Sequence, residues 1–316
     1  HPELCQLSND QYLMDPGVPA TGDYIASICQ EIAQNYDVDG IHLDYIRYPE
    51  NGIRFSDAQT YKRYGQGQPI NRWRTENVTR VVRKIRRAVD SVRPGIVLSC
   101  SPVGKYADMA RHSSRGWNAR DAVHQDAVAW LNEGTMDVLF PMMYFDGDNF
   151  YPFVLDWKER AQRGAIVPGL GLYCLSANEK DWPLVALQRQ INFLRTQHLN
   201  GFCLFRSKFL TDNVKGVFDW LSHSYDNNPL QAMGGIFETL RQQKKSTAVS
   251  PSADSQKVPQ LNVDAETFVV VDNTGREIRR FRPDSTFNTA DLPHGFYQLR
   301  ALGRKKANHK IMDFRK

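Results

Sequence analysis

The sequence predicts an α/β main domain of parallel strands that alternate with helices, followed by a small all-β domain. Three observations predict this organisation. Five buried, strand-like runs alternate with helical patterns as far as about residue 225, and such alternation implies parallel pairing through crossovers. Residues 226–260 include a Ser/Pro/Lys-rich segment with little to bury, and residues 261–316 show the period-two pattern of strands. We therefore expect a main domain at 1–225, a linker at 226–260 and a small β-sandwich module at 261–316.

The most informative strand lies in the run YDVDGIHLDYIRYP, residues 36–49. Apolar residues flank His42, and a polar cluster of Asp44, Arg47 and Tyr48 follows before a proline, which cannot donate to a ladder. Because catalytic groups of (β/α) barrels lie where strands end, Asp44 is a candidate acid, base or nucleophile. The alternatives are that Asp44 pairs with Arg47 or accepts backbone N–H bonds, and that His42 is a hydrogen-bonded core residue.

The other elements follow in order along the chain. Apolar residues at helical spacing predict helices at 23–36, 78–92 and 119–133, with Gly134 ending the last. Buried runs predict strands at 96–104, 136–144, 165–175 and 201–205. We expect a turn at 14–17 and a functional loop at 48–71. The C-terminal module is expected to contain strands at 267–272, 277–281, 295–300 and 310–314, with a hairpin turn at 272–275.

Composition excludes several classes of protein. The net charge of +5 is not concentrated in a basic stripe with interleaved aromatics, so we expect no nucleic-acid partner. No apolar run approaches the ~20 residues of a membrane span. Five cysteines without CxxC spacing predict buried thiols rather than disulfides or a zinc site, and we expect neither metal nor cofactor. The chain starts with His, so the lack of a signal peptide carries no information on export.

Four ordered motifs together resemble the bacterial glycosyl-hydrolase-like family 10. They are Asp39–Tyr45 with Arg47–Pro49, the turn Ser99–Gly104, the segment from Gln125 to Asp137, and Pro141–Tyr144. The similarity covers roughly Asp10 to Trp220. It implies a (β/α)8 TIM-type barrel, glycan hydrolysis without a metal, and a periplasmic, outer-membrane-associated or secreted location in a bacterium. It also implies a poly- or oligosaccharide substrate, since some relatives act on peptidoglycan glycan strands stripped of peptides.

Two departures limit what the resemblance implies. The run Asp39–Tyr45 is also similar to a strand signature of the family-18 chitinases, but Ile46 stands where those enzymes carry their proton-donating glutamate. We therefore do not expect the chitinase mechanism. In the resembled family about three strands precede this region, whereas five are predicted here in all. We expect a barrel lacking its first strands, either because the chain is a fragment or because self-association completes the barrel.

Glycoside cleavage requires one carboxylic acid to protonate the leaving oxygen and a second carboxylate to attack or to activate water. Asp44 is our first choice for one of these groups. Asp146, which follows the third strand, is the candidate for the other. Its alternative is a residue that caps a loop.

Sugar rings are bound by aromatic faces together with planar hydrogen-bonding groups. The candidate substrate-binding residues lie at or near predicted strand ends, or in the long loop after the second strand. They are His42, Tyr45, Arg47, Tyr48, Trp117, Tyr144, Tyr173 and Arg206. Arg47 could instead hold Asp44 ionised, and Trp117 could be a loop staple that packs on the barrel.

The leading interpretation is a glycoside hydrolase that acts on a bacterial envelope or environmental polysaccharide. The rival is a non-catalytic glycan-binding or scaffold protein of the cell envelope, favoured by the missing strands and the lack of an evident second carboxylate. A metal-dependent deacetylase or phosphatase would rest on His42 and Asp44 alone, and two ligands fall short of a site. The C-terminal module loosely resembles the sorting domains of secreted Bacteroidetes proteins, the alternative being a generic accessory or carbohydrate-binding β-sandwich.

Overall fold

The structure, a computed structural model, describes residues 1–8, 10–49, 55–224, 267–272, 276–282, 296–302 and 311–315. The chain divides into two compact units, residues 1–249 and 250–316, and each is described by itself. The predicted linker at 226–260 and most of the predicted hairpin turn at 272–275 lie outside the described residues.

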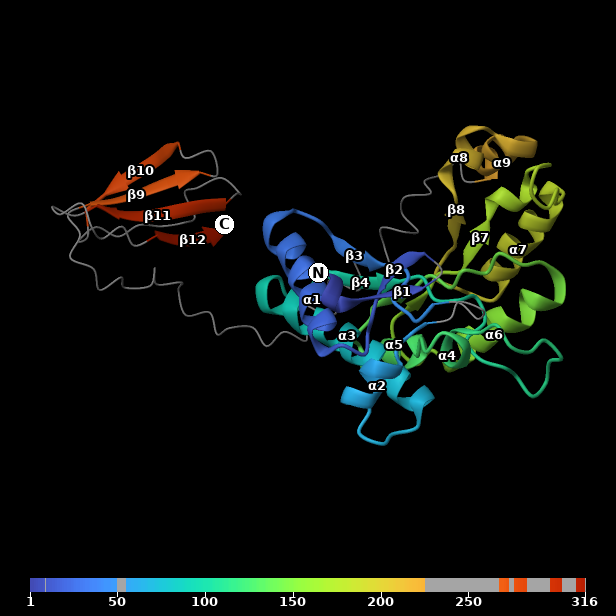
Figure 1. The fold of residues 1–316 in the computed structure, drawn as a ribbon. Coiled ribbons are helices and arrows are strands. Elements are labelled where there is room, and N and C mark those ends of the chain that lie inside the picture. Colours follow the sequence, from blue (N-terminus) through green and yellow to red (C-terminus); the bar gives the residue numbers. More distant parts are fainter. Residues whose placement is uncertain are drawn as a thin grey trace. The chain divides into compact units, whose positions relative to one another are not determined.

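Parallel strands form the centre of the first unit (Figure 1). The strands β3 (Gly40–Leu43), β4 (Val97–Cys100), β5 (Val138–Leu139) and β6 (Ala165–Ile166) pair in that order, and β7 (Gly169–Gly171) pairs with β8 (Cys203–Phe205). Parallel bridges from Val103 to Met142 and from Met142 to Gly169 continue the pairing towards β7. The five predicted strands are confirmed, and the fourth is divided into β6 and β7.

Helices connect these strands. Before β3 lie η1 (Pro2–Leu4) and α1 (Pro19–Asn35), and between β3 and β4 lie α2 (Ala58–Tyr64) and α3 (Ile70–Val92). The helices α4 (Ala119–Ala122) and α5 (Ala127–Glu133) precede β5, and η2 (Gly147–Asn149) and α6 (Tyr151–Arg160) precede β6. Between β7 and β8 lie η3 (Leu172–Leu175) and α7 (Leu184–Thr196), and α8 (Ser207–Thr211), η4 (Val214–Gly216) and α9 (Val217–Ser224) follow β8. None of the described helices is long and apolar enough to cross a membrane.

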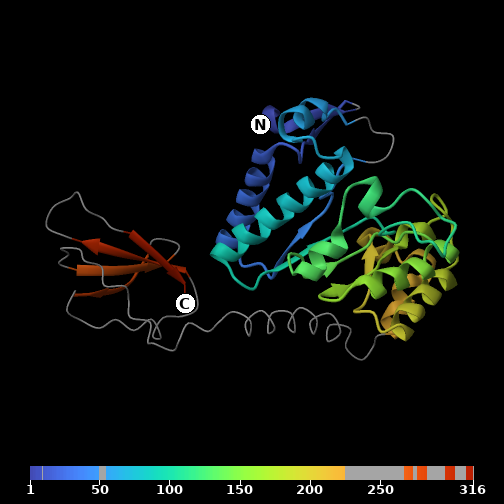
Figure 2. The ribbon, with the colours of Figure 1, turned by 90° about the horizontal axis from the view of Figure 1, so that it is seen from below.

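The two faces of the sheet bury different side chains, because successive strand residues point to opposite sides. One face packs with the helices in the main core, which includes Ile41, Leu43, Leu98, Cys100, Leu139 and Ile166. Figure 2 shows α1 and α3 side by side, and Ala26 of α1 and Ile85 of α3 belong to this same core. The opposite face carries a small separate cluster of Val97, Val138, Ala165 and Val167.

Within the described residues the sheet is an open array, because β3 pairs with β4 alone and β8 with β7 alone. The α/β class is confirmed, whereas the closed eight-stranded barrel stays a prediction. The expectation that the cysteines are buried is wrong for Cys203, which is exposed at the edge strand β8, and for Cys5, which is half-buried. All five cysteines are free thiols.

The antiparallel pair β1 (Cys5–Ser8) and β2 (Gln11–Met14) is an addition to the predicted elements. Its four-residue strands do not bury alternate residues, so they lack the period-two signal of a half-buried strand. The predicted turn at 14–17 is confirmed, because Asp15 Oδ1 accepts a hydrogen bond from Gly17 N at 2.8 Å.

Tertiary contacts shift two predicted helix boundaries. α3 begins at Ile70 rather than at residue 78, because Trp73 is buried against the turn at Gly17, where an added Cβ would lie 2.6 Å from the Trp73 ring. The predicted helix 119–133 is interrupted between α4 and α5, where His124 has a φ of +59° and Asp126 caps α5 by accepting from Ala129 N. Gly134, with a φ of +77°, ends α5 as predicted.

The second unit is a four-stranded antiparallel sheet with the order β10-β9-β11-β12. Its strands are β9 (Thr267–Asp272), β10 (Glu277–Phe281), β11 (Phe296–Leu302) and β12 (Ile311–Arg315). The four predicted strands are confirmed. Val269 and Val270 are buried, and the rings of Phe268 and Phe281 lie 5.6 Å apart. The resemblance to a sorting domain stays a prediction.

Replacing Ile85 with Ala should destabilise the first unit by about 2–5 kcal/mol, because this fully buried side chain of α3 would leave a cavity in the main core. The matched control is Ile28→Ala on α1, where the side chain is exposed and the change should stay within about 0.5 kcal/mol. All six tryptophans lie in the first unit, so denaturant unfolding followed by their fluorescence reports on this unit. Equal effects of the two substitutions would contradict the assigned packing.

Candidate functional site

Asp44 is the first residue beyond β3, at the carboxyl end of the parallel strands, and its side chain is exposed. Its Oδ1 accepts a hydrogen bond from the backbone N–H of Tyr45 at 2.9 Å. This is the backbone bond that the sequence offered as an alternative role, yet it occupies only one of the two oxygens. The carboxylate is therefore fixed in orientation and open to a ligand.

Tyr45 presents its ring to solvent beside this carboxylate. The side chain is 66% exposed, and the backbone has a φ of +53°, which is unusual for a bulky residue. The guanidinium of the buried Arg47 lies 4.4 Å from the centre of the Tyr45 ring and 5.7 Å from that of Trp117. Trp117 also packs against the small cluster of Val103, Ala119 and Val123, as its alternative role as a packing residue would require, and its contact with substrate stays a prediction. These contacts hold an exposed aromatic face next to Asp44.

His42 lies on the face of the sheet opposite the main core, between Ser99 of β4 and Ser101, which follows that strand. Its Nδ1 is 2.9 Å from Ser99 Oγ, and its Nε2 is 2.7 Å from Ser101 Oγ. Burial lowers the pKa of His42, and the nearby charge of Asp44 only partly offsets this effect. The imidazole is therefore neutral at pH 7 and fixed by hydrogen bonds at both nitrogens. The parallel register sets His42 opposite Ser99, and Ser101 follows two residues later along the chain.

Three aromatic residues gather at the ends of the later strands. The rings of Tyr144 and Phe205 are stacked with centres 5.2 Å apart, and Tyr173 meets Tyr144 edge-on at 5.7 Å. Phe205 is 46% exposed, whereas Arg206 lies beside Phe209 at 5.6 Å. Two of these rings, Tyr144 and Tyr173, were predicted as sugar contacts, and the structure brings them together.

The phenols of this cluster keep their protons at neutral pH. Burial raises the pKa of Tyr173 to about 12, and it also raises the pKa of Tyr144. The charge of Asp44 adds to the rise at Tyr144, which places the Asp44 carboxylate within electrostatic reach of this cluster. Both groups are therefore neutral hydroxyls at pH 7, and that of Tyr173 is hydrogen-bonded to Cys174.

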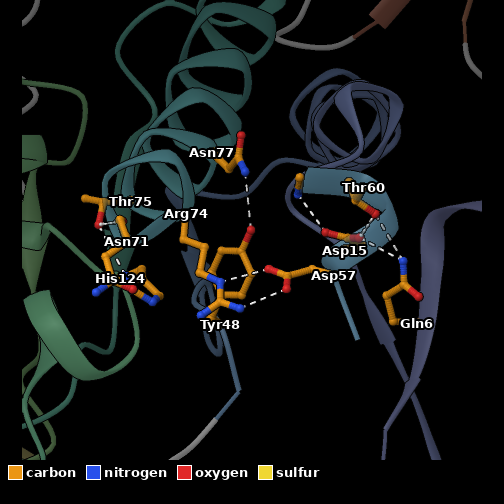
Figure 3. A network of polar contacts seen from close by, with 11 residues as sticks. Gln6, Asp15, Tyr48, Asp57, Thr60, Asn71, Arg74, Thr75, Asn77 and His124 are labelled. Atoms are coloured by element: carbon orange, nitrogen blue, oxygen red, sulfur yellow. Dashed lines mark hydrogen bonds and ion pairs between the residues drawn. The ribbon is translucent and has the colours of Figure 1, made fainter. Parts of the chain in front are cut away.

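Tyr48, predicted to contact substrate, lies instead in a buried polar network (Figure 3). It is 3% exposed, its hydroxyl accepts a hydrogen bond from Asn77 Nδ2 at 3.3 Å, and Arg74 lies over its ring at 5.6 Å. Arg74 in turn donates two hydrogen bonds of 2.8 Å to the buried carboxylate of Asp57. A ligand cannot reach this ring in the described structure, so Tyr48 positions the backbone rather than the substrate.

The interruption between α4 and α5 holds the segment that follows β3. The carbonyl of Val123 accepts from Tyr48 N at 3.0 Å, and the fully buried Gln125 donates from Nε2 to Ile46 O at 3.4 Å. Gln125 Oε1 also accepts from Val103 N at 3.1 Å. A continuous helix would use the Val123 carbonyl internally, so the break frees it to bind the segment after Asp44, while the Gln125 side chain joins that segment to the residues after β4.

Asp146, the second predicted carboxylate, is exposed and caps η2 by accepting from Gly147 N at 2.8 Å. Its charge acts on Tyr151, which lies in α6. The capping bond matches the alternative role that the sequence offered, and a catalytic role for Asp146 stays a prediction. In the part of the chain that the structure describes, no group of three or more His, Cys, Asp or Glu residues is placed to hold a metal ion.

Comparison with known proteins agrees with the motifs at these strand ends. Residues 3–169, more than half of the chain, match the glycosyl hydrolase-like 10 family. The chain belongs to this family. The matched region contains Asp44, Tyr45, Arg47, Trp117 and Tyr144, and it ends where β7 begins.

Curated relatives include the glycosyl hydrolase DigH of Escherichia coli K12, which is 27% identical over 230 residues, 66% of this chain and 52% of DigH. The glycosyl hydrolase YngK of Bacillus subtilis 168 is 26% identical over 275 residues, 79% of this chain and 53% of YngK. The chain thus spans about half the length of these relatives. Among solved structures, bee venom hyaluronidase in complex with a hyaluronic acid tetramer is 14% identical with a TM-score of 0.38, over 73% of this chain and 83% of that chain.

His124 lies at the rim of the buried network, and its environment predicts a pH dependence of stability. Its ring meets Tyr48 edge-on at 5.4 Å, and Thr75 Oγ1 is 3.4 Å from its Nδ1. Burial, and then the charge of Arg74, lower the pKa of His124 to about 4, with Asp57 and Asp121 partly offsetting this. In the unfolded chain the group titrates near 6.5, so the unfolded state binds the proton first as the pH falls.

The free energy of unfolding should therefore fall between about pH 6.5 and pH 4, and this contribution should be constant above that window. His124→Gln should flatten the decline by on the order of 3 kcal/mol, measured by denaturant unfolding at several pH values. The exposed His223→Gln is the control and should keep the wild-type slope. An unchanged slope in His124→Gln would show that His124 is not held neutral.

Proposed function

We propose that this chain is a glycoside hydrolase that cleaves a bacterial envelope or environmental polysaccharide by carboxylate chemistry. The observation that carries the proposal is the exposed Asp44 at the end of β3, beside the exposed ring of Tyr45. Membership of a glycosyl hydrolase-like family supports it.

The surroundings of Asp44 suit a sugar ring. Tyr45 and Phe205 expose aromatic faces, which bind the apolar face of a sugar, while the Tyr144 hydroxyl and the Ser101 hydroxyl held by His42 supply polar groups for its hydroxyls. The fixed carboxylate of Asp44 can take a proton from water or bond to the anomeric carbon. We propose that this chemistry requires no metal ion and no cofactor.

As substrate we propose peptidoglycan glycan strands stripped of peptides, which fits the resemblance of the strand-end motifs. A periplasmic, outer-membrane-associated or secreted location follows from such a substrate. Both statements concern the whole protein, whereas this chain spans about half the length of its curated relatives.

A non-catalytic glycan-binding role is the second candidate. It is favoured by the position of Asp146, the predicted second carboxylate. Its side chain caps η2, which leaves Asp44 without the partner that the sequence predicted. Binding of glycan fragments without release of reducing ends would support this alternative.

Asp44→Asn should lower the release of reducing ends from denuded peptidoglycan by about 10²- to 10⁴-fold, because the amide can neither accept a proton nor attack. The fold should be retained, as shown by circular dichroism, because Asp44 is exposed and its amide oxygen can still accept from Tyr45 N. Asp148→Asn, at an exposed aspartate of η2, is the control and should keep wild-type activity. Full activity of Asp44→Asn would remove Asp44 from the mechanism.

Tyr45→Ala should weaken glycan binding by about tenfold, which corresponds to about 1.4 kcal/mol for a lost stacking surface. Affinity is best measured by calorimetry in the Asp44→Asn background, where turnover does not interfere. Tyr12→Ala removes another highly exposed tyrosine, on β2, and should leave the affinity unchanged. Equal affinities of the Tyr45 variant and its parent would exclude Tyr45 from the binding surface.

A further inference from the structure

The segment that follows β7 is folded tightly at the strand's end. The backbone N–H groups of Glu179 and Asp181 both donate to Ser176 O at 3.0 Å, and Trp182 N donates to Cys174 O at 2.9 Å. These hydrogen bonds close a compact loop after η3. They fix the backbone of the loop, and with it the Cα positions of the residues at its tip, relative to β7. In a parallel sheet this is the edge where Asp44 lies.

Three charged residues follow one another in this loop, and two of them fasten it. Lys180 Nζ donates to the carbonyl of Tyr144 at 3.0 Å, which ties the loop to the segment after β5. Asp181 Oδ1 accepts from Lys215 Nζ at 2.6 Å. Glu179 is exposed, and within the described residues its carboxylate makes no hydrogen bond or ion pair. Glu179 is therefore the acid of this loop that remains available for chemistry.

Glu179 and Asp44 reach the same aromatic cluster from different strands. Tyr144 and Tyr173 are in edge contact at 5.7 Å. The charge of Glu179 contributes to the raised pKa of Tyr173, after burial and Cys174, and the charge of Asp44 contributes to that of Tyr144. Lys180, the neighbour of Glu179, is bonded to Tyr144 itself. The segment after β3 and the loop after β7 thus both border the cluster of Tyr144, Tyr173 and Phe205.

We propose that Glu179 is the second carboxyl group of the reaction and acts as the general acid opposite Asp44. This inference rests on the proposed glycoside hydrolase function. The carboxyl proton of Glu179 passes to the glycosidic oxygen as the bond between that oxygen and the anomeric carbon breaks. A water oxygen bonds to the anomeric carbon, and its proton passes to the carboxylate of Asp44. One water is consumed, and proton exchange with solvent restores both carboxyl groups.

Glu179 suits this role better than Asp146. Asp146 Oδ1 is engaged in the cap of η2, and its charge acts on Tyr151 rather than on the Tyr144 cluster. Glu179 has neither constraint and stands on a loop bonded to Tyr144. The competing interpretation of Glu179 is a solvated loop acid without a function, and the experiment below separates the two.

The test compares two substrates, denuded glycan strands and a 2,4-dinitrophenyl glycoside of the disaccharide that the wild-type chain releases from them. Glu179→Gln should lower kcat on the strands by about 10²- to 10⁴-fold, because the natural leaving group needs a proton. On the dinitrophenyl glycoside, whose leaving group needs none, the loss should stay within about tenfold. Asp44→Asn should lower the rate on both substrates. Asp148→Asn is again the control, and Asp146→Asn tests the rival acid.

The outcomes distinguish this inference from the proposed function. If the wild-type chain cleaves the strands and the Glu179→Gln variant cleaves them equally fast, only the role of Glu179 is overturned. The same holds if Glu179→Gln loses equal activity on both substrates, or if Asp146→Asn shows the leaving-group dependence instead. A wild-type chain that releases no reducing ends would overturn both proposals. Circular dichroism of Glu179→Gln checks the fold, and Glu179→Asp should recover part of the activity on the strands.

Discussion

The parallel register between β3 and β4 is the constraint on which the candidate site depends. It sets His42 opposite Ser99 and Leu43 opposite Cys100, so Asp44 is the first residue to leave the sheet. The close approach requires glycine at position 40, where an added Cβ would lie 2.8 Å from Val97 O. Strand side chains alternate between the two faces of the sheet. A shift of the register by one residue would therefore turn His42 into the main core and Leu43 to the opposite face.

Much of this fold was predictable because burial leaves a strong pattern in the sequence. The five predicted strands of the first unit are apolar runs, and the valines of α3 recur at helical spacing. The pattern failed where a partner distant in the sequence decides the structure. Trp73 extends α3 because it packs against Gly17, and the break at His124 exists because Val123 and Gln125 serve the segment after β3. Neither partnership leaves a local signal.

The candidate site was predictable to the extent that it lies at strand ends. Position alone identified Asp44, Tyr45 and Tyr144, and the ordered motifs identified the family, which the comparison confirms. The position of Tyr48 after a strand led to a wrong prediction of substrate contact. Arg74 and Asn77, which cover its ring and bind its hydroxyl, belong to α3 and leave no signal in the strand sequence. Glu179 escaped notice for the opposite reason. An exposed loop glutamate is ordinary in sequence, and the role proposed for Glu179 is argued from the hydrogen bond between its neighbour Lys180 and the Tyr144 carbonyl.

The left-handed backbone at Tyr45 lowers the stability of the fold, whereas the ring that it carries is proposed to bind the ligand. A bulky residue in this conformation loses on the order of 1–3 kcal/mol relative to a relaxed one. Glycine would relieve that strain and asparagine would reduce it, yet either would remove the aromatic face beside Asp44. If Tyr45 binds sugar as proposed, thermostability and ligand affinity oppose each other at position 45, and selection for heat resistance alone would be expected to remove this aromatic ring first.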